Sequence, residues 1–244
     1  MATPKTCSTP GTAIAVKNEL LKLVNHEKAN FYPRFFKTGK GEYGEGDQFL
    51  GVVVPDQRRI ARKPAFQNLP LDEVKKLLAD PYHECRLTAL FILVGQFESA
   101  DNAAGRKKVC DFYLAQLDRV NNWDLVDSSA HKILGPQLEQ SHYRRRLNQL
   151  ADSGDLWRQR VAVIATLHLI KIGEFDLTLE LCERFLDHAH DLIHKATGWM
   201  LREIGKQDQQ VLAAFLNRFH KKMPRAMLRY AIEHFDPNRR KKWM

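Results

Sequence analysis

The residues best suited to chemistry lie in NNWDLVDSSAHKILG, residues 121–135, where a tryptophan and two aspartates occur in a chain of formal net charge +9. Trp123 and Asp127 are four residues apart and would share one face of a helix. A carboxylate can stabilise positive charge that develops in a reaction and can orient an attacking water molecule. An indole face attracts cations. The pair is therefore suited to a substrate with a cationic centre.

The overall charge favours an anionic partner. The chain has 38 Lys and Arg residues against 29 Asp and Glu, with a pI near 9.4, and this balance is typical of proteins that bind nucleic acid or a membrane surface. The longest apolar run, VAVIATLHLI, is far shorter than the roughly 20 residues that a membrane-spanning helix needs. We therefore expect a soluble protein with no membrane partner.

The cysteines and the N-terminus both indicate a reducing compartment. Cys7, Cys85, Cys110 and Cys182 are widely spaced and form no CxxC pair; the last three lie in helix-like apolar patterns, where buried free thiols are expected. Residues 1–13 lack the apolar region of a secretion signal and are expected to form a disordered lead-in. The expected location is the cytoplasm.

Apolar residues recur at spacings of three and four along most of the chain, which predicts an all-α fold. The predicted helical segments are residues 71–80, 86–97, 106–117, 157–172, 175–186, 192–204, 211–219 and 226–235. Only FLGVVV, residues 49–54, resembles a strand, and Pro55 after it indicates a helix with proline at its first position.

The predicted helices form pairs, and the second helix of each pair has one polar residue followed by small and apolar ones. This pattern begins at Arg86, Asp127, Arg160, Lys195 and Arg225. Its spacing of roughly 35 residues is typical of HEAT-like helical repeats. We expect one HEAT-like solenoid domain over residues 14–236, followed by a basic tail over residues 237–244.

Equivalent positions of successive repeats line up in a column on one surface of a solenoid. Residues on one helix that are three or four apart share a face. Together these rules predict a groove lined by two indoles, one carboxylate and several cations. The predicted lining residues are Trp123, Trp199, Asp127, Arg160, Lys195 and Arg202.

A carboxylate in a basic groove weakens the binding of phosphates, so Asp127 needs a role other than DNA affinity. Purines alkylated at N3 or N7 are cationic, and their loss leaves an oxocarbenium-like sugar. A nearby carboxylate would stabilise that sugar, and aromatic faces would hold the cationic base. The groove therefore fits hydrolysis of the N-glycosidic bond of an alkylated purine.

Structural roles would account for the same residues. Trp123 and Trp199 could pack in the core or between repeats, and Asp127 could cap its helix or bridge to the next repeat. Arg160 could pair with Asp127 or with Asp155, because buried ion pairs between repeats occur in such arrays.

Three other features are expected to be structural. Asp124 is expected to be an exposed acid or a helix cap. The glycine-rich segment TGKGEYGEGD, residues 38–47, lacks the GK[ST] ending of a phosphate loop and is expected to connect the first helices. His188, His190 and His194 lack an accompanying HExxH glutamate and straddle a predicted helix junction, so no metal site is expected.

At these residues the chain resembles the AlkD-like DNA alkylation repair enzymes, a family of HEAT-like-repeat alkylpurine DNA glycosylases. The matching segments are FLGVVVPDQRR, NNWDLVDSSAHKILG, LWRQRVAVIATL and IHKATGWMLREIGK. With the helices between them, the resemblance covers most of the chain after about residue 14. The combination is specific, whereas each segment alone is not.

The resemblance assigns roles to individual positions. In that family the tryptophan and the second aspartate of the W-D-x-V-D motif are active-site residues, here Trp123 and Asp127. The arginine of the W-x-x-R motif, here Arg160, contacts the DNA backbone. The tryptophan of the G-W-x-L-R-E motif, here Trp199, faces the lesion nucleotide. An N-terminal aromatic residue that contacts DNA falls at positions 35–36, where the 38–47 segment leaves the register open.

The resemblance implies a monofunctional glycosylase that releases N3- and N7-alkylpurines from duplex DNA as a monomer, with no cofactor, metal or catalytic lysine. The expected catalytic residues are Asp127, Trp123 and Trp199, and the expected DNA-binding residues are Arg160, Arg202, Lys195 and Phe35. Two alternatives stay open. One is a noncatalytic relative that binds distorted or branched DNA by shape, and the other is a protein-binding scaffold.

Overall fold

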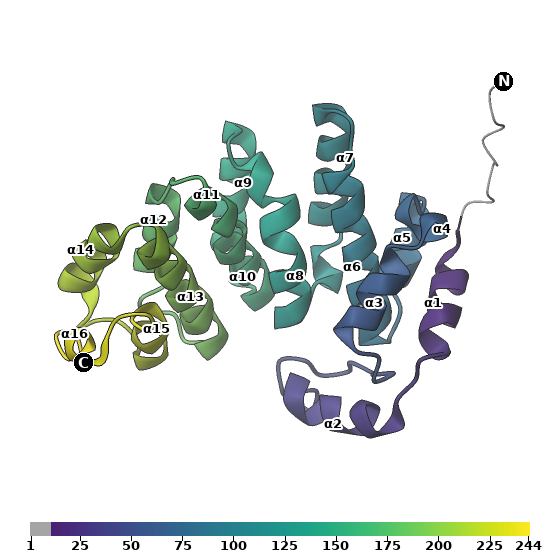
Figure 1. The fold of residues 1–244 in the computed structure, drawn as a ribbon, viewed down its shortest axis with the longest axis horizontal. Helices are drawn as coiled ribbons and strands as arrows, with labels where there is room; N and C mark the ends of the chain where they lie inside the picture. The colour runs from purple at the N-terminus through teal and green to yellow at the C-terminus, as the bar shows by residue number, and fades with distance from the viewer. Residues whose placement is uncertain (1–10) are drawn as a thin grey trace. The chain divides into compact units, whose positions relative to one another are not determined.

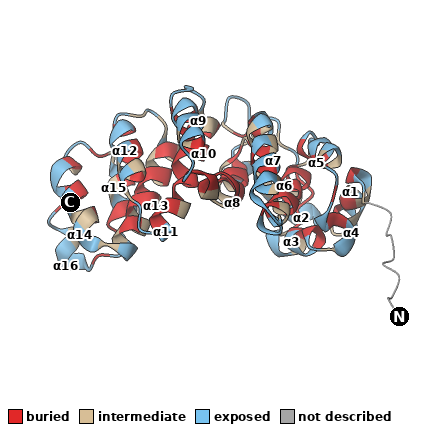
Figure 2. Ribbon diagram, turned by 90° about the horizontal axis from the view of Figure 1, so that it is seen from above, coloured by how far each residue is buried: buried red, intermediate tan, exposed pale blue. Residues whose placement is uncertain are grey.

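The computed structural model describes residues 11–244, and their regular secondary structure is helical apart from one isolated bridge between Gln48 and Tyr82 (Figure 1). The chain forms two compact units, Met1–Ser129 and Ala130–Met244. The boundary falls inside helix α8, Trp123–Ile133. In each unit the buried residues lie where helices pack on one another (Figure 2).

The first unit is built around one helix, α6 (His83–Glu98), most of whose residues are buried. Its elements are α1 (Ala13–Leu21), α2 (His26–Phe36), α3 (Val54–Ala61), α4 (Pro64–Gln67), α5 (Leu71–Leu78), α6 (His83–Glu98), α7 (Ala103–Ala115) and the 3₁₀ helix η1 (Leu117–Arg119). Helices α1, α3, α4, α5 and α7 all contact α6. Because α6 is apolar around most of its circumference, it forms the core of this unit.

The second unit has a similar centre in α13. Its elements are η2 (Gly135–Gln137), α9 (Ser141–Ala151), α10 (Leu156–Ala165), α11 (Leu167–Lys171), α12 (Asp176–Arg184), α13 (Asp191–Gln207), α14 (Gln209–Phe219), α15 (Arg225–Ala231) and α16 (Pro237–Arg240). Helix α13 contacts α10 and α15 as well as α12 and α14. The helices α10, α13 and α15 are those predicted to be the second members of successive pairs, and their mutual packing is typical of helical repeats.

The strand-like segment 49–54 forms no strand. Helix α3 begins at Val54 with proline in its first turn, as predicted. The preceding residues are held by Glu84 of α6, whose carboxylate accepts hydrogen bonds from the backbone N–H groups of Leu50, Gly51 and Val52 at 3.0, 2.8 and 3.2 Å. A buried carboxylate therefore satisfies the donors that a neighbouring strand would otherwise bond.

The predicted helix over residues 157–172 is divided in two. Helix α10 ends at Ala165 and α11 begins at Leu167. At Thr166 both the backbone N–H and the hydroxyl donate to the carbonyl of Val163, at 3.2 and 2.7 Å, and such local bonds compete with the regular helix ladder. The break lies beside Gly135, where an added Cβ would approach the Ala165 carbonyl to 2.8 Å.

The structure describes the C-terminal end of the chain and only part of the N-terminal end. Of the predicted lead-in over residues 1–13, the first ten residues lie outside the described part, and α1 begins at Ala13. Residues 237–244 are basic, but they include α16 and a buried Trp243 whose indole N–H donates to Asn217 at 3.1 Å. The single domain over residues 14–236 stays a prediction.

Two further findings concern the described residues. None of the helices within residues 11–244 has both the length and the apolar character that crossing a membrane requires. Cys85, Cys110 and Cys182 are buried free thiols, as predicted for the apolar helix patterns. Cys7 lies outside the described residues.

Candidate functional site

Trp123 and Asp127 lie one turn apart on α8, as their spacing predicts, and both are half-buried. Asp127 lies near the enclosed phenol of Tyr113. Burial raises the pKa of Tyr113, the hydrogen bond to Ser129 opposes that rise, and the charge of Asp127 adds to it. The carboxylate is thus partly shielded from water without being enclosed, a setting that strengthens its electrostatic effect on neighbouring groups.

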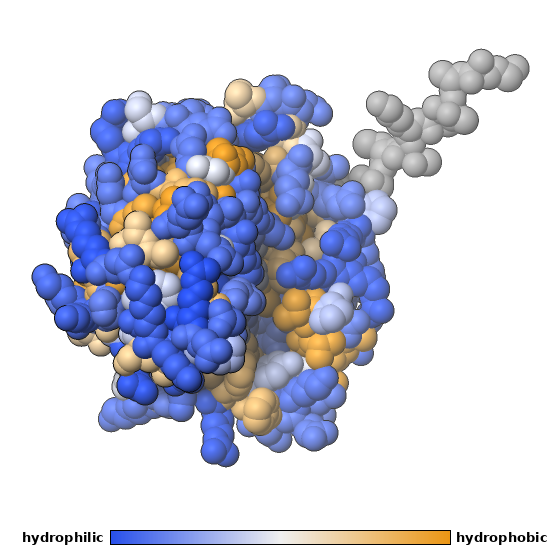
Figure 3. Space-filling view, turned by 60° about the vertical axis from the view of Figure 1, so that its left-hand side comes forward, coloured by the Kyte–Doolittle hydropathy of each residue, from blue (hydrophilic) through white to orange (hydrophobic). Residues whose placement is uncertain are grey.

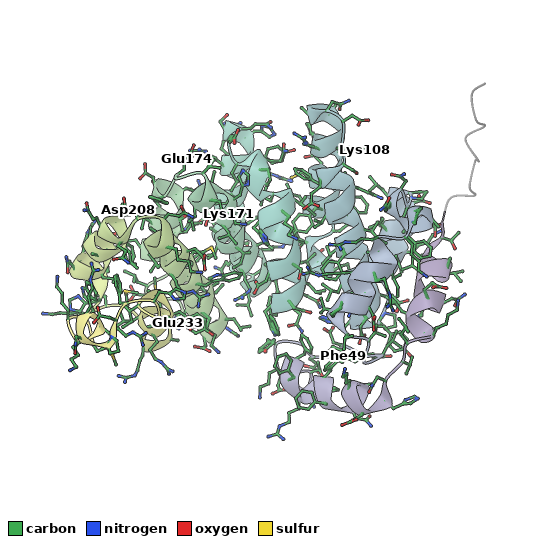
Figure 4. The ribbon with its side chains drawn as sticks, viewed as in Figure 1. Phe49, Lys108, Lys171, Glu174, Asp208 and Glu233 are labelled. Carbon is green, nitrogen blue, oxygen red and sulfur yellow. The ribbon has the colours of Figure 1, made fainter. Side chains whose placement is uncertain are left out.

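Trp123 packs against a stack of aromatic rings. Its indole lies nearly parallel to the ring of Phe36, with centroids 5.4 Å apart and 12° between the planes. Phe36 in turn stacks on Phe49 at 5.1 Å, which lies in the segment between α2 and α3 (Figure 4). Such ring pairs are worth about 0.5–1.5 kcal/mol each beyond area burial, so they hold the indole in a defined orientation.

The two candidates for an N-terminal aromatic contact differ in exposure. Phe36 is 8% exposed, whereas Phe35 is 52% exposed and meets the edge of Trp123 at a centroid distance of 5.8 Å. Phe36 is therefore a supporting residue. The structure brings Phe35 and Trp123 together at one surface of the first unit.

A buried histidine holds the first turn of α8. Nδ1 of His83 lies 2.9 Å from Asp47, and Nε2 lies 2.8 Å from Asp124. Because each ring nitrogen faces a carboxylate, the pair of contacts favours the imidazolium form, in which both nitrogens donate. Burial alone would lower the pKa of His83, but the two carboxylates more than offset it and raise the pKa to about 9.

Asp47 joins this histidine to three other groups. Its carboxylate pairs with the guanidinium of Arg86 and accepts a hydrogen bond from the side chain of Asn122 at 3.3 Å. Burial by itself would raise the pKa of Asp47, but the bond from His83 and the charge of Arg86 lower it below its usual value. Arg86 also donates to Asn121 at 2.6 Å. The network therefore fixes the residues immediately before Trp123.

This network was missed from the sequence, and it corrects the expectation that Asp124 is an exposed acid. Asp124 is an ion-pair partner of His83 with its side chain 13% exposed, so it is not an exposed acid. The segment 38–47 does connect the first helices, but Asp47 is also a structural residue. The available signal was the placement of His83 and Arg86, three apart, at the start of an otherwise apolar helix, where buried charges require partners.

In the second unit, Arg160 and Lys195 lie near the start of α13. Arg160 is buried, and its guanidinium donates to the backbone carbonyl of Leu192. Lys195 pairs with Asp191 at 2.6 Å. Burial lowers the pKa of His190, and the charges of Arg160 and Lys195 both add to that effect, so both cations lie near this histidine.

Trp199 and Arg202 share a surface on the same helix, as predicted. The indole N–H of Trp199 donates to Glu203 at 3.0 Å, and Arg202 pairs with Glu203 and with Glu233, which is labelled in Figure 4. Both side chains are half-buried. Helix α13 can approach α15 here because Gly198 has no side chain: an added Cβ would lie 2.5 Å from the Met227 carbonyl.

The predicted site residues thus fall into two sets. Trp123, Asp127 and Phe35 belong to the first unit, and Trp199, Arg160, Lys195 and Arg202 belong to the second. The single row predicted for Asp127, Arg160 and Lys195 would cross from one unit to the other and stays a prediction.

Three histidines at the junction of α12 and α13 bond to the protein itself: His188 and His190 precede α13, and His194 lies in its first turn. His188 Nε2 lies 3.0 Å from the side-chain oxygen of Gln159, and its Nδ1 accepts from the backbone N–H of His190. His194 Nε2 contacts the carbonyl of His188 at 2.5 Å. Within residues 11–244 no three or more His, Cys, Asp or Glu side chains are grouped so that they could hold a metal ion.

Comparison with known proteins decides the family. A family model described as DNA alkylation repair enzyme matches residues 16–235. The chain belongs to this DNA alkylation repair enzyme family. Membership supports a role in DNA repair, and DNA is the substrate that the family's description implies. No curated protein matches the chain in sequence.

A solved structure is similar to this DNA alkylation repair family member over most of its length. It is described as a predicted DNA alkylation repair enzyme from Enterococcus faecalis, and the two chains share 16% sequence identity with a TM-score of 0.64. The match covers 88% of this chain and 97% of the other. The likeness confirms the predicted fold class, an all-α HEAT-like helical-repeat fold.

Proposed function

We propose that the protein is a monofunctional DNA glycosylase that hydrolyses the N-glycosidic bond of purines alkylated at N3 or N7 in duplex DNA. The observation that carries this proposal is the pairing of Asp127 with Trp123 on α8, both half-buried, with the indole held by a buried aromatic stack. Membership of a DNA alkylation repair family supports the substrate class.

In the proposed reaction the bond between C1′ and the purine nitrogen breaks, and its electron pair neutralises the cationic base. Positive charge then develops on the sugar, where the carboxylate of Asp127 stabilises it. A water molecule that Asp127 orients adds to C1′ and releases one proton to solvent, which leaves an abasic site and a free, neutral base. The leaving group already carries positive charge, so the step requires no metal or organic cofactor.

The remaining predicted residues would bind the DNA. Trp123 would contact the nucleotide at Asp127, since aromatic faces attract cations by about 0.5–2 kcal/mol, and Trp199 would contact the bound DNA from the second unit. Arg160, Lys195 and Arg202 would contact flanking phosphates, where each neutralised phosphate contributes to salt-dependent affinity. The proposed enzyme acts as a monomer.

Replacing Asp127 by Asn tests the proposal. The change keeps the shape of the side chain and removes its charge, so we expect release of N7-methylguanine from methylated duplex to slow by about 100-fold or more under single-turnover conditions. Affinity for the duplex should stay equal or rise, because one carboxylate no longer repels phosphates. Asp111→Asn, which changes an exposed carboxylate on α7, is the matched control.

Wild-type release by Asp127→Asn would reject the catalytic role. Salt-dependent binding of DNA by the native chain without any base release would instead identify the noncatalytic DNA-binding alternative. Absence of salt-dependent binding would favour the protein scaffold.

A further inference from the structure

Helix α2 displays two phenylalanines to solvent beside the candidate site. Phe31 and Phe35 are 58% and 52% exposed, and they are four residues apart, so they lie on the same face of the helix. Their rings are stacked, with centroids 6.2 Å apart and 24° between the planes. Burying a phenylalanine ring is favourable, so two adjacent exposed rings offer apolar surface that a ligand could cover.

The neighbouring side chains of α2, which pack inward, hold these rings in place. Phe36 is buried against Phe49, and Tyr32 meets the edge of the Phe49 ring at 5.6 Å. At the N-terminus of the helix, Asn25 caps the backbone N–H of Lys28 at 2.9 Å. The exposed rings are therefore presented by a packed and capped helix, which lowers the entropy lost when a ligand binds to them.

The exposed pair is continuous with the indole of α8. The ring of Phe35 lies between Phe31 and Trp123, at centroid distances of 6.2 and 5.8 Å. On the face of the protein shown in Figure 3, most exposed side chains are hydrophilic and apolar ones gather in few patches. An aromatic surface that leads away from Trp123 therefore suggests a ligand that extends beyond the base held at Trp123.

The charges on and beside α2 identify the chemistry of that ligand. Lys28, Arg34 and Lys37 are exposed on or directly after the helix, and Glu27 is the exposed acid on the helix itself. In the loop that follows, the exposed Glu42 pairs with Lys37 at 3.9 Å, which leaves Lys28 and Arg34 as the cations most available to a ligand. Aromatic side chains interleaved with cations are typical of surfaces that bind single-stranded nucleic acid, where bases stack on the rings and cations follow the phosphates. A purely apolar protein partner would not require these cations.

We propose that Phe31 and Phe35 form a stacking surface for an unstacked nucleobase of the DNA next to the nucleotide at Trp123. The proposal rests on the proposed function, because it takes DNA to be bound at Trp123. It adds two features that neither the motifs nor the family comparison assigns. One is an unpaired base as a ligand, and the other is Phe31 as a binding residue. The stacking surface would favour duplexes in which a base has already left the stack.

Equilibrium binding to two duplexes tests the proposal: one is fully paired and the other carries a single unpaired nucleotide. The native chain should prefer the second duplex. Stacking on an aromatic side chain is worth roughly 1–3 kcal/mol per base, so Phe31→Ala should weaken binding to it by roughly 5- to 150-fold. Affinity for the paired duplex should change little.

Two further substitutions separate stacking from apolar contact. Phe31→Tyr keeps the ring and should retain the preference, whereas Phe31→Leu keeps an apolar side chain without the ring and should lose it. Ile14→Ala removes another exposed apolar side chain of the first unit, on α1 and 72% exposed, and should have no effect. Because Phe31 is on the surface, thermal melting should be the same for all four variants.

The outcomes distinguish this proposal from the proposed function. If Phe31→Leu keeps the native preference, or if Phe31→Ala does, the stacking surface is rejected even when base release is intact. If the native chain binds neither duplex, both proposals fail. Loss of the preference in Phe31→Ala and Phe31→Leu, with rescue in Phe31→Tyr, supports the stacking surface.

Discussion

Replacing His83 by Gln should destabilise the protein, and the loss should depend on pH. His83 is 2% exposed, and both of its ring nitrogens face carboxylates, those of Asp47 and Asp124. The positive charge of Arg86 disfavours protonation of His83, but it also offsets part of the negative charge of Asp47. Glutamine can bond to one or both carboxylates, yet it cannot carry the compensating charge.

The magnitude follows from the pKa of the histidine. A rise from 6.5 to about 9 corresponds to about 3 kcal/mol, at 1.36 kcal/mol per unit. The group's pKa is raised on folding, so its contribution is fully present below pH 6.5. The contribution declines as pH rises from 6.5 towards 9 and is lost above it. At pH 6 we expect the free energy of unfolding of the His83→Gln variant to be about 3 kcal/mol lower than that of the native chain.

Urea unfolding at pH 6, 7.5 and 9.5 measures the effect. The difference in unfolding free energy between native and variant chains should be largest at pH 6 and should shrink by about 3 kcal/mol by pH 9.5. Measurements stay above pH 5, because the lowered pKa of Asp47 means that its own contribution is lost as pH falls. His26→Gln, at the exposed first position of α2, is the control. A difference that is constant across this pH range would refute the ion-pair reasoning.

Two other predictions concern the backbone and the C-terminus. Gly51→Ala should destabilise the protein by at least about 2 kcal/mol more than Gly154→Ala. Both glycines have positive φ, so both substitutions are strained. A Cβ at Gly51 would also lie 2.1 Å from the Asn25 carbonyl oxygen, whereas Gly154 faces open space. Urea unfolding of the two variants compares them directly, and equal losses would contradict the close approach. Changing Lys241 and Lys242 to Gln should reduce the slope of log K for DNA against log salt by up to about 2 if both contact phosphates. These substitutions leave the buried Trp243 in place, and an unchanged slope would exclude the two lysines from the DNA footprint.

Local patterns in the sequence predicted most of the helices. The three- and four-residue spacing of apolar side chains identified the helical segments, and Pro55 identified the start of α3, because both signals act within one or two turns. The break at Thr166 was not predictable in this way. It depends on a hydroxyl that bonds to Val163 and on the close approach of Gly135, and neither appears in the hydrophobic pattern.

The candidate site was predictable to the same extent. The spacing of Trp123 and Asp127 sufficed to place them on one helix face, and the motif that contains them indicated the family. The support for this pair could not be predicted, because Asp47 and His83 meet across 36 residues of chain and no local rule pairs them. The exposure of Phe31 likewise depends on which face of α2 packs inward, and that is set by Phe36 and Phe49.

The glycine-rich loop between α2 and α3 has consequences for how this chain can vary. At Gly41 and Gly46 there is open space around the backbone, whereas a side chain at Gly44 would collide with the Phe36 carbonyl at 2.5 Å. Gly41 and Gly46 have φ values of 78° and 89°, so another residue would be strained there even though its side chain has room. Asp47, the last residue of the loop, pairs with Arg86 and bonds to His83 and Asn122. A substitution at Asp47 would therefore disturb the residues that hold Trp123, although the two are 76 positions apart in the sequence.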